Sequence, residues 1–289
     1  MTTRPLGVNT WVWTSPLTRA GLARLAPRLR DWGFDLVELP VENLDDFDPT
    51  EAAAMLSDLG LGATVALVMP PGRELVDAPA EVVRSTQDYL FRVADIAAEL
   101  GSPVMAGPAY SSVGRTWRMT EQDRAECYRQ LRSHLRPVID HAGSVGVTLA
   151  VEPLNRYETS LLNTVDQTLE ALRGLPEEHC GLALDVYHLN IEERDIAAAI
   201  RRAGDRIAHV QVCANDRGAP GADHLDWPGI RDALDAVGYA GPLVIESFTA
   251  DNAAIATAAS VWRPLATGQD DLARDGLAFL TSLHCTDKK

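Results

Sequence analysis

Short apolar runs alternate with longer amphipathic segments along this chain. Repeatedly, an amphipathic segment closes at a glycine and an apolar run begins a few residues later. Glycine is typical of the position just past a helix, because it enters the left-handed backbone region without a steric penalty. The pattern therefore predicts a helix that ends, and a strand that follows, at each of these glycines: Gly33, Gly60, Gly101, Gly146, Gly174, Gly204 and Gly238.

With the N-terminal run, the apolar runs predict eight strands, over residues 6–13, 36–39, 63–68, 104–106, 147–152, 181–185, 207–213 and 242–246. The amphipathic segments predict helices such as residues 18–32, 81–100 and 122–141. Eight alternating units in 289 residues fit a closed (β/α)8 TIM barrel, an α/β fold, better than an open sheet. We expect residues 1–289 to form one domain, with 252–289 as a C-terminal helical segment that caps the barrel or takes part in an oligomer.

Charge and composition indicate which kinds of binding partner and which cellular location to expect. The chain has 26 basic and 41 acidic residues, a net charge of −15, which argues against nucleic-acid and membrane partners. No apolar stretch approaches the ~20 residues of a membrane span, and the N-terminus has no apolar signal core, so a cytoplasmic location is predicted. The four cysteines are widely spaced, which predicts reduced, mostly buried thiols.

Four polar residues end the last four predicted strands: Glu152, Asp185, Gln211 and Glu246. In a TIM barrel these ends meet at the C-terminal mouth, where the chemistry is carried out. Converging carboxylates repel one another unless a cation lies between them, although a helix cap or an arginine would also relieve each acid. Carboxylate and amide oxygens favour a hard divalent ion such as Mn²⁺ or Mg²⁺. The pattern predicts a metal site with these four residues as ligands.

Several segments resemble the ketose 3-epimerase group of the xylose-isomerase-like sugar phosphate isomerase and epimerase superfamily, which includes the D-tagatose and D-allulose (psicose) 3-epimerases. They are VEPLNRYETS at 151–160, LDVYH at 184–188, CANDRGAPG at 213–221, VIES at 244–247 and AASVWRPL at 258–265. The resemblance covers nearly the whole chain. It implies an isomerase-class enzyme that depends on a divalent metal, first Mn²⁺, with Mg²⁺ or Co²⁺ as alternatives, and that forms a homodimer or homotetramer.

The resemblance also assigns residue roles. It implies that Glu152, Asp185 and Glu246 bind the metal and that Glu152 and Glu246 are the catalytic acid/base pair. The matching positions Glu158, His188 and Arg217 would then bind the O1 to O3 end of the sugar.

One ligand position departs from the group's pattern. Where these epimerases usually have a second histidine, this strand reads His209-Val-Gln211. Glutamine can bind metal through its amide oxygen, as hydroxypyruvate isomerase relatives do. Alternate residues lie ~6.6 Å apart along a strand, so we expect His209 to lie one layer deeper in a supporting or core role. Glu38, inside the second predicted strand, must likewise be paired, metal-bound or at the mouth.

The expected reaction explains why two glutamates are needed. The C3 proton of a ketose is weakly acidic, and a divalent ion at O2 and O3 would stabilise the charge that grows as it leaves. One glutamate would remove this proton to give a cis-enediolate, and the other would return a proton to the opposite face. The expected substrate is a free ketose of the D-tagatose, D-fructose/D-allulose or ribulose type.

Other readings stay open from the sequence. Gln211 also suits an aldose-ketose isomerase of the hydroxypyruvate or inosose type, and a non-catalytic barrel that binds metal and sugar is a third possibility. A metal-dependent apurinic endonuclease would need a histidine-rich site and a DNA-binding face, which the charge of −15 opposes. Candidates for the sugar's apolar wall are Trp11, Trp13, Tyr110 and Trp117. Only residues 70–73 and Arg115 hint at a phosphate site.

Overall fold

The computed structural model describes residues 4–285 and shows a closed barrel of eight parallel strands in sequence order. The strands are β1 (Leu6–Asn9), β2 (Leu36–Val41), β3 (Gly62–Leu67), β4 (Val104–Gly107), β5 (Thr148–Val151), β6 (Cys180–Asp185), β7 (Ile207–Val212) and β8 (Leu243–Ile245). Pairing of β1 with β8 closes the barrel, which confirms the predicted TIM-barrel fold.

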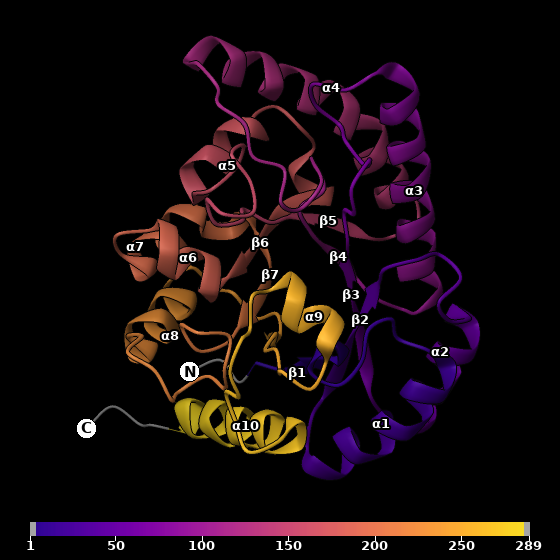
Figure 1. Ribbon diagram of the computed structural model, residues 1–289, viewed down its shortest axis with the longest axis vertical. Helices are drawn as coiled ribbons and strands as arrows, with labels where there is room; N and C mark the ends of the chain where they lie inside the picture. Colours follow the sequence, from indigo (N-terminus) through magenta and orange to yellow (C-terminus); the bar gives the residue numbers. More distant parts are fainter. Residues whose placement is uncertain (1–3, 286–289) are drawn as a thin grey trace.

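Helices surround this barrel (Figure 1). They are α1 (Arg19–Trp32), α2 (Pro49–Asp58), α3 (Ala80–Glu99), α4 (Glu121–Ser144), α5 (Val165–Ala171), α6 (Val186–Glu192), α7 (Ile196–Ala203), α8 (Trp227–Ala236), α9 (Ala253–Ala258) and α10 (Gln269–Cys285). None of the helices within residues 4–285 combines the length and the apolar character that a membrane crossing requires.

Local sequence signals set the helix boundaries. Thr18 caps the start of α1 by accepting a hydrogen bond from the Gly21 N–H, and Gly33 ends the helix with φ at 101°. All seven predicted helix-end glycines have positive φ, as expected for glycines that follow the end of a helical segment. Each helix thus stops where the chain must turn back into the barrel.

The main core lies between the strands and the surrounding helices, where buried aliphatic side chains form one large cluster. Inside the barrel, the register brings polar residues together. Asn9 of β1 is level with Glu38 of β2, and Glu38 is level with Thr64 of β3. On the other side of the barrel, Asp185 of β6 is level with Gln211 of β7. The strands therefore present polar groups to one shared interior space.

Two segments differ in detail from the sequence-based prediction. The first strand was predicted to reach residue 13, but it ends at Asn9, whose side chain accepts a hydrogen bond from the Trp11 N–H and starts a 3₁₀ turn over Thr10–Val12. The predicted C-terminal helical segment forms two helices, and its last residues, 286–289, lie outside the described part of the chain. The second of the two, α10, packs against β1, β8 and α8.

Candidate active site

The last four strands deliver four buried polar side chains to the C-terminal end of the barrel. Glu152 follows β5, Asp185 ends β6, Gln211 lies near the end of β7, and Glu246 follows β8. Their exposed fractions are 6%, 1%, 2% and 5%. The chain therefore holds three carboxyl groups and one amide out of water at the position where TIM-barrel enzymes have their active sites.

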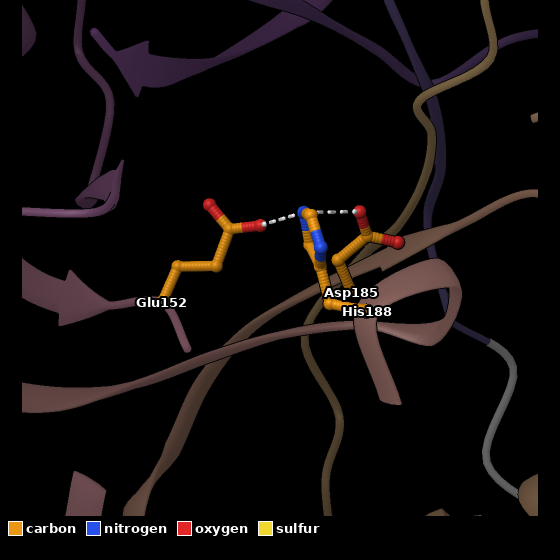
Figure 2. A group of neighbouring side chains, drawn as sticks. All are labelled: Glu152, Asp185 and His188. Atoms are coloured by element: carbon orange, nitrogen blue, oxygen red, sulfur yellow. Dashed lines mark ion pairs between the residues drawn. The ribbon is translucent and has the colours of Figure 1, made fainter. Parts of the chain in front are cut away.

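Two of these carboxylates and a histidine lie close enough to share an ion. Figure 2 shows His188 between Glu152 and Asp185, with its Nε2 atom 3.5 Å from an oxygen of each. One ligand atom from each residue lies within 4.8 Å of the other two. His188 reaches this point because α6 begins directly after Asp185, whose carboxylate accepts a hydrogen bond from the Tyr187 N–H and caps the helix.

Asn155 fixes the orientation of the His188 ring. Its backbone N–H and its side-chain amide lie 3.1 and 3.0 Å from His188 Nδ1. A backbone N–H can only donate, so Nδ1 accepts, while Arg217 Nη2, which is also a donor, lies 3.1 Å from Nε2. Burial lowers the pKa of His188 to about 3, so the ring is neutral near pH 7. His188 is therefore a neutral ring held between Asn155 and Arg217.

Arg217 enters the same site from the loop after β7. It is 5% exposed, and its Nη1 atom lies 2.5 Å from Asp185 Oδ2 and 3.0 Å from Glu246 Oε2. The guanidinium also stacks on Tyr187 and Phe248, at 4.1 and 4.7 Å from their ring centres. A φ of 71° at Arg217 turns the chain inward. Two of the acids thus do meet an arginine, and one of them also caps a helix.

Within residues 4–285, the Glu152 carboxylate has neither an arginine within ion-pair distance nor a helix N-terminus to cap, so its charge is the least compensated of the three. Burial raises the pKa of Glu152 well above its ordinary value, and repulsion from Glu246 and Asp185 adds to the rise. Burial also raises the pKa of Glu246, against the attraction of Arg217. These carboxylates would be stabilised in their charged form by a further cation.

A second polar layer lies below these acids. Glu38 is fully buried and accepts hydrogen bonds from His209 Nε2 at 2.6 Å and from Gln211 Nε2 at 2.8 Å. Burial alone would raise the pKa of Glu38, but the attraction of His209 and the hydrogen bonds it receives bring it below its ordinary value. His209 lies in this deeper layer, as the strand spacing predicted.

The donor set fits a hard divalent cation. Gln211 Oε1 is buried and has no hydrogen-bond partner within residues 4–285, although both hydrogens of its amide group are used. An unpaired buried carbonyl oxygen beside three carboxylates is the arrangement in which a missing partner is expected to be an ion. The residues that could hold it are Glu152, Asp185, Gln211 and Glu246.

The remaining predicted residues have separate positions. Glu158 is partly buried and accepts a hydrogen bond from Asn155 Nδ2 at 2.7 Å, which links it to the site. Tyr110 is fully buried and donates to the Glu152 carbonyl at 3.0 Å, and Trp11 packs edge-on against Phe248. These contacts connect all three residues to the catalytic end of the barrel.

The other two predicted aromatics lie elsewhere. Trp13 packs against Trp32 of α1 and donates to Asp270, so it contributes to the core beside α10. Trp117 stacks beneath Arg115, with 4.4 Å from the guanidinium carbon to the ring centre. A position in sequence near a strand end did not distinguish these roles, because the direction of each side chain depends on its packing partners.

Asn155, Tyr187 and Phe248 take part in the site although the sequence did not single them out. Asn155 follows the Glu152 strand in the motif that carries the resemblance, and Phe248 lies two residues after Glu246. A polar or aromatic residue directly after a catalytic strand end was the available signal. Their contacts with His188 and Arg217 became evident only from the folded arrangement.

Comparisons with known proteins identify the family. Residues 27–283 match the family model described as a xylose isomerase-like TIM barrel. The ketose 3-epimerase of Arthrobacter globiformis is 31% identical over 277 residues, 95% of each chain. The solved structure of an L-ribulose 3-epimerase is 30% identical with a TM-score of 0.89, over 98% of this chain and 96% of that one. A D-allulose 3-epimerase from Methylomonas sp. in complex with D-allulose has 26% identity and a TM-score of 0.87, over 98% of each chain.

A barrel with buried carboxylates gathered at its C-terminal mouth defines the class as a TIM-barrel enzyme. The chain belongs to the xylose isomerase-like TIM-barrel family and, within it, to the ketose 3-epimerases. It is therefore an isomerase-class enzyme, as the sequence resemblance implied.

Proposed function

We propose that this chain inverts C3 of a free ketohexose or ketopentose with the help of a divalent metal ion. The observation that carries the proposal is the convergence of three buried carboxyl groups with the unpaired amide oxygen of Gln211. The relatives named for L-ribulose and D-allulose support a ketose substrate. Glu152 and Glu246 would act as the acid/base pair on the two faces of C3.

The metal would be held by Glu152, Asp185, Gln211 and Glu246, with Mn²⁺ as the first candidate and Mg²⁺ or Co²⁺ as alternatives. When bound, such an ion supplies Lewis-acid stabilisation of negative charge on neighbouring oxygens. His188 also lies within reach of such an ion, but its Nε2 atom already faces Arg217 Nη2 at 3.1 Å.

The two glutamates suit opposite proton transfers. A glutamate whose pKa is raised by burial is a better base when charged and remains able to hold a proton near neutral pH. Glu152 and Glu246 project from opposite sides of the group, from β5 and β8. One would take the C3 proton to form the cis-enediolate and the other would return a proton, with the direction set by the epimer that is bound.

His188, Arg217 and Glu158 would hold the O1 to O3 end of the sugar. Arg217 is fixed between Tyr187 and Phe248, so its guanidinium offers donors in a set direction. Phe248 and Trp11 form an apolar surface next to it. These contacts support a ligand with several hydroxyl groups at one end and a less polar face at the other.

The ion pairs of Arg115 favour a free sugar over a phosphosugar. Arg115 is engaged by Glu74 at 2.7 Å and by Asp77 at 2.9 Å. Arg73 stacks on Tyr89, with its guanidinium carbon 3.7 Å from the ring centre. The Arg115 guanidinium is thus occupied by carboxylates and gives little support for a phosphosugar, whereas Arg73 Nε has no hydrogen-bond partner within residues 4–285.

Proton NMR in D₂O tests the proposal. Metal-stripped protein would be incubated with D-tagatose, D-fructose or L-ribulose, before and after Mn²⁺ is added. We expect metal-dependent deuterium entry at C3 together with the 3-epimer. Exchange at C1 with formation of an aldose would instead favour the isomerase alternative that Gln211 left open, and no exchange with any of these sugars would contradict the proposed substrate class. The homodimer or homotetramer and the cytoplasmic location stay predictions.

A further inference from the structure

Glu38 is a buried carboxylate that takes no part in the proposed proton transfers. It is fully buried in β2 and accepts hydrogen bonds from donors on both neighbouring strands and on β7 across the barrel. The donors are Asn9 Nδ2 at 2.9 Å, Thr64 Oγ1 at 3.3 Å, His209 Nε2 at 2.6 Å and Gln211 Nε2 at 2.8 Å. So complete a set of partners keeps a charged group stable away from water.

The main effect of Glu38 falls on the amide of Gln211. Gln211 Nε2 donates both of its hydrogens to carboxylates, one to Glu38 Oε2 and one to Glu246 Oε1, each at 2.8 Å. If the amide were flipped, its carbonyl oxygen would face two acceptors. The amide therefore has a single favourable orientation, in which Oε1 is left buried and without a partner.

Of the two carboxylates that accept hydrogen bonds from this amide, only Glu38 has no proposed role in metal binding or proton transfer. Glu246 is itself a proposed metal ligand and acid/base group, and it also accepts a hydrogen bond from Arg217. Glu38 lies deeper and is fixed by Asn9 and His209. The anchor that keeps Gln211 in place while a metal or sugar binds is therefore Glu38.

We propose that Glu38 is a positioning residue, which holds the Gln211 amide with Oε1 free to bind the divalent cation. This inference rests on the proposed function, since it assumes a cation among the carboxylates at the mouth. Groups that orient a metal-binding side chain typically change metal affinity by about 10- to 100-fold when they are removed. The same loss is expected here, because a rotated amide would present N–H groups to the cation.

The experiment measures Mn²⁺ binding by the full chain without any sugar. Metal-stripped protein is titrated with Mn²⁺, and the electron paramagnetic resonance signal of free Mn²⁺ gives the Kd. Glu38→Gln is compared in the wild-type and Gln211→Ala backgrounds, as a double-mutant cycle. We expect Glu38→Gln to raise the Kd about 10- to 100-fold in the wild type and less than about threefold once Gln211 is absent. Thr64→Val is the matched control, since it removes the longest hydrogen bond to Glu38 and should leave the Kd unchanged.

A second variant separates the hydrogen bond from the charge. Glu38→Asp keeps the negative charge but withdraws the carboxylate by one methylene, so it should raise the Kd as Glu38→Gln does. The inference is overturned by a wild-type Kd in Glu38→Asp, by an equal rise in both backgrounds, or by an unchanged Kd in Gln211→Ala. Deuterium exchange at C3 by the wild-type enzyme tests the proposed function independently, so the two ideas can fail separately.

Discussion

Replacing Asn155 with alanine should weaken catalysis although Asn155 has no direct part in the proposed chemistry. Its side-chain amide donates to His188 Nδ1 at 3.0 Å and to Glu158 Oε1 at 2.7 Å. The first is a neutral hydrogen bond, for which a net ~0.5–1.5 kcal/mol is typical, and the second has a charged acceptor, for which ~1.5–3 kcal/mol is typical. Alanine would therefore loosen two proposed sugar contacts at once.

The size of the loss in kcat/KM depends on the hydrogen bonds that remain in Asn155→Ala. The backbone N–H of Asn155 still donates to His188 Nδ1 at 3.1 Å, so the ring keeps one of the two hydrogen bonds from Asn155 and only part of the first contribution is lost. We expect a loss of about 2–3 kcal/mol, which corresponds to a kcat/KM about 30- to 150-fold lower. The loss should fall on the binding of the transition state, because these contacts orient groups toward the reacting end of the sugar.

The assay is ketose epimerisation followed by chromatography at saturating Mn²⁺. Asn43→Ala is the matched control, because the Asn43 side chain makes its hydrogen bonds only in an exposed turn with Asp46. Circular dichroism would show that both variants are folded. A kcat/KM for Asn155→Ala within about threefold of the wild type would refute the idea that Asn155 positions His188 and Glu158.

Four further outcomes are expected. Glu152→Gln and Glu246→Gln should each lower C3 exchange by about 10²- to 10⁴-fold, because each removes one proton carrier; a wild-type exchange rate in either variant would exclude that residue from the pair. Gln211→His should retain activity but change the order of affinities for Mn²⁺, Mg²⁺ and Co²⁺ in metal titrations, and an unaltered order would argue against ligation by Gln211. Chelation should lower the Tm, because a free ion concentration of 100 times the Kd adds about 2.7 kcal/mol to the free energy of unfolding. A constant Tm in calorimetry would argue against tight binding. His188 has a folded-state pKa of about 3, so below pH ~6.5 the unfolded chain takes up a proton that the native state does not. The free energy of unfolding should therefore decrease as the pH falls, with an extra slope that approaches ~1.4 kcal/mol per pH unit. Urea unfolding at pH 7 and pH 5 should show a smaller decrease for His188→Asn than for the wild type.

Much of the fold could be predicted because it depends on local signals. The glycine at the end of α1 and the apolar run of β2 mark a helix and a strand without knowledge of their neighbours. The end of β1 was misjudged because the apolar run continues past Asn9, while the Asn9 side chain turns the chain by capping the Trp11 N–H. A single side-chain hydrogen bond here outweighed the apolar pattern.

The site was predictable to the level of strand ends and no further. Because parallel strands end at the same side of a barrel, Glu152, Asp185 and Glu246 could be expected together from their order alone. The burial of Arg217 could not, since the sequence fits a solvated turn, and the contacts that hold its guanidinium come from distant residues, such as Asp185 and Glu246. The contact of Glu38 with Gln211 joins β2 to β7, and sequence separation carries no information about such pairs.

The ion pairs of Arg115 tie the loop after β3 to the loop after β4, since Arg115 binds both Glu74 and Asp77 from the other loop. The groups proposed for proton transfer and metal binding all come from β5 to β8. The proposed reactive groups thus come from one half of the rim, and the Arg115 ion pairs join loops of the other half. Directed evolution toward a new ketose would do best to randomise the loops after β2 and β3, because Trp11 after β1 and Tyr110 after β4 contact Phe248 and Glu152.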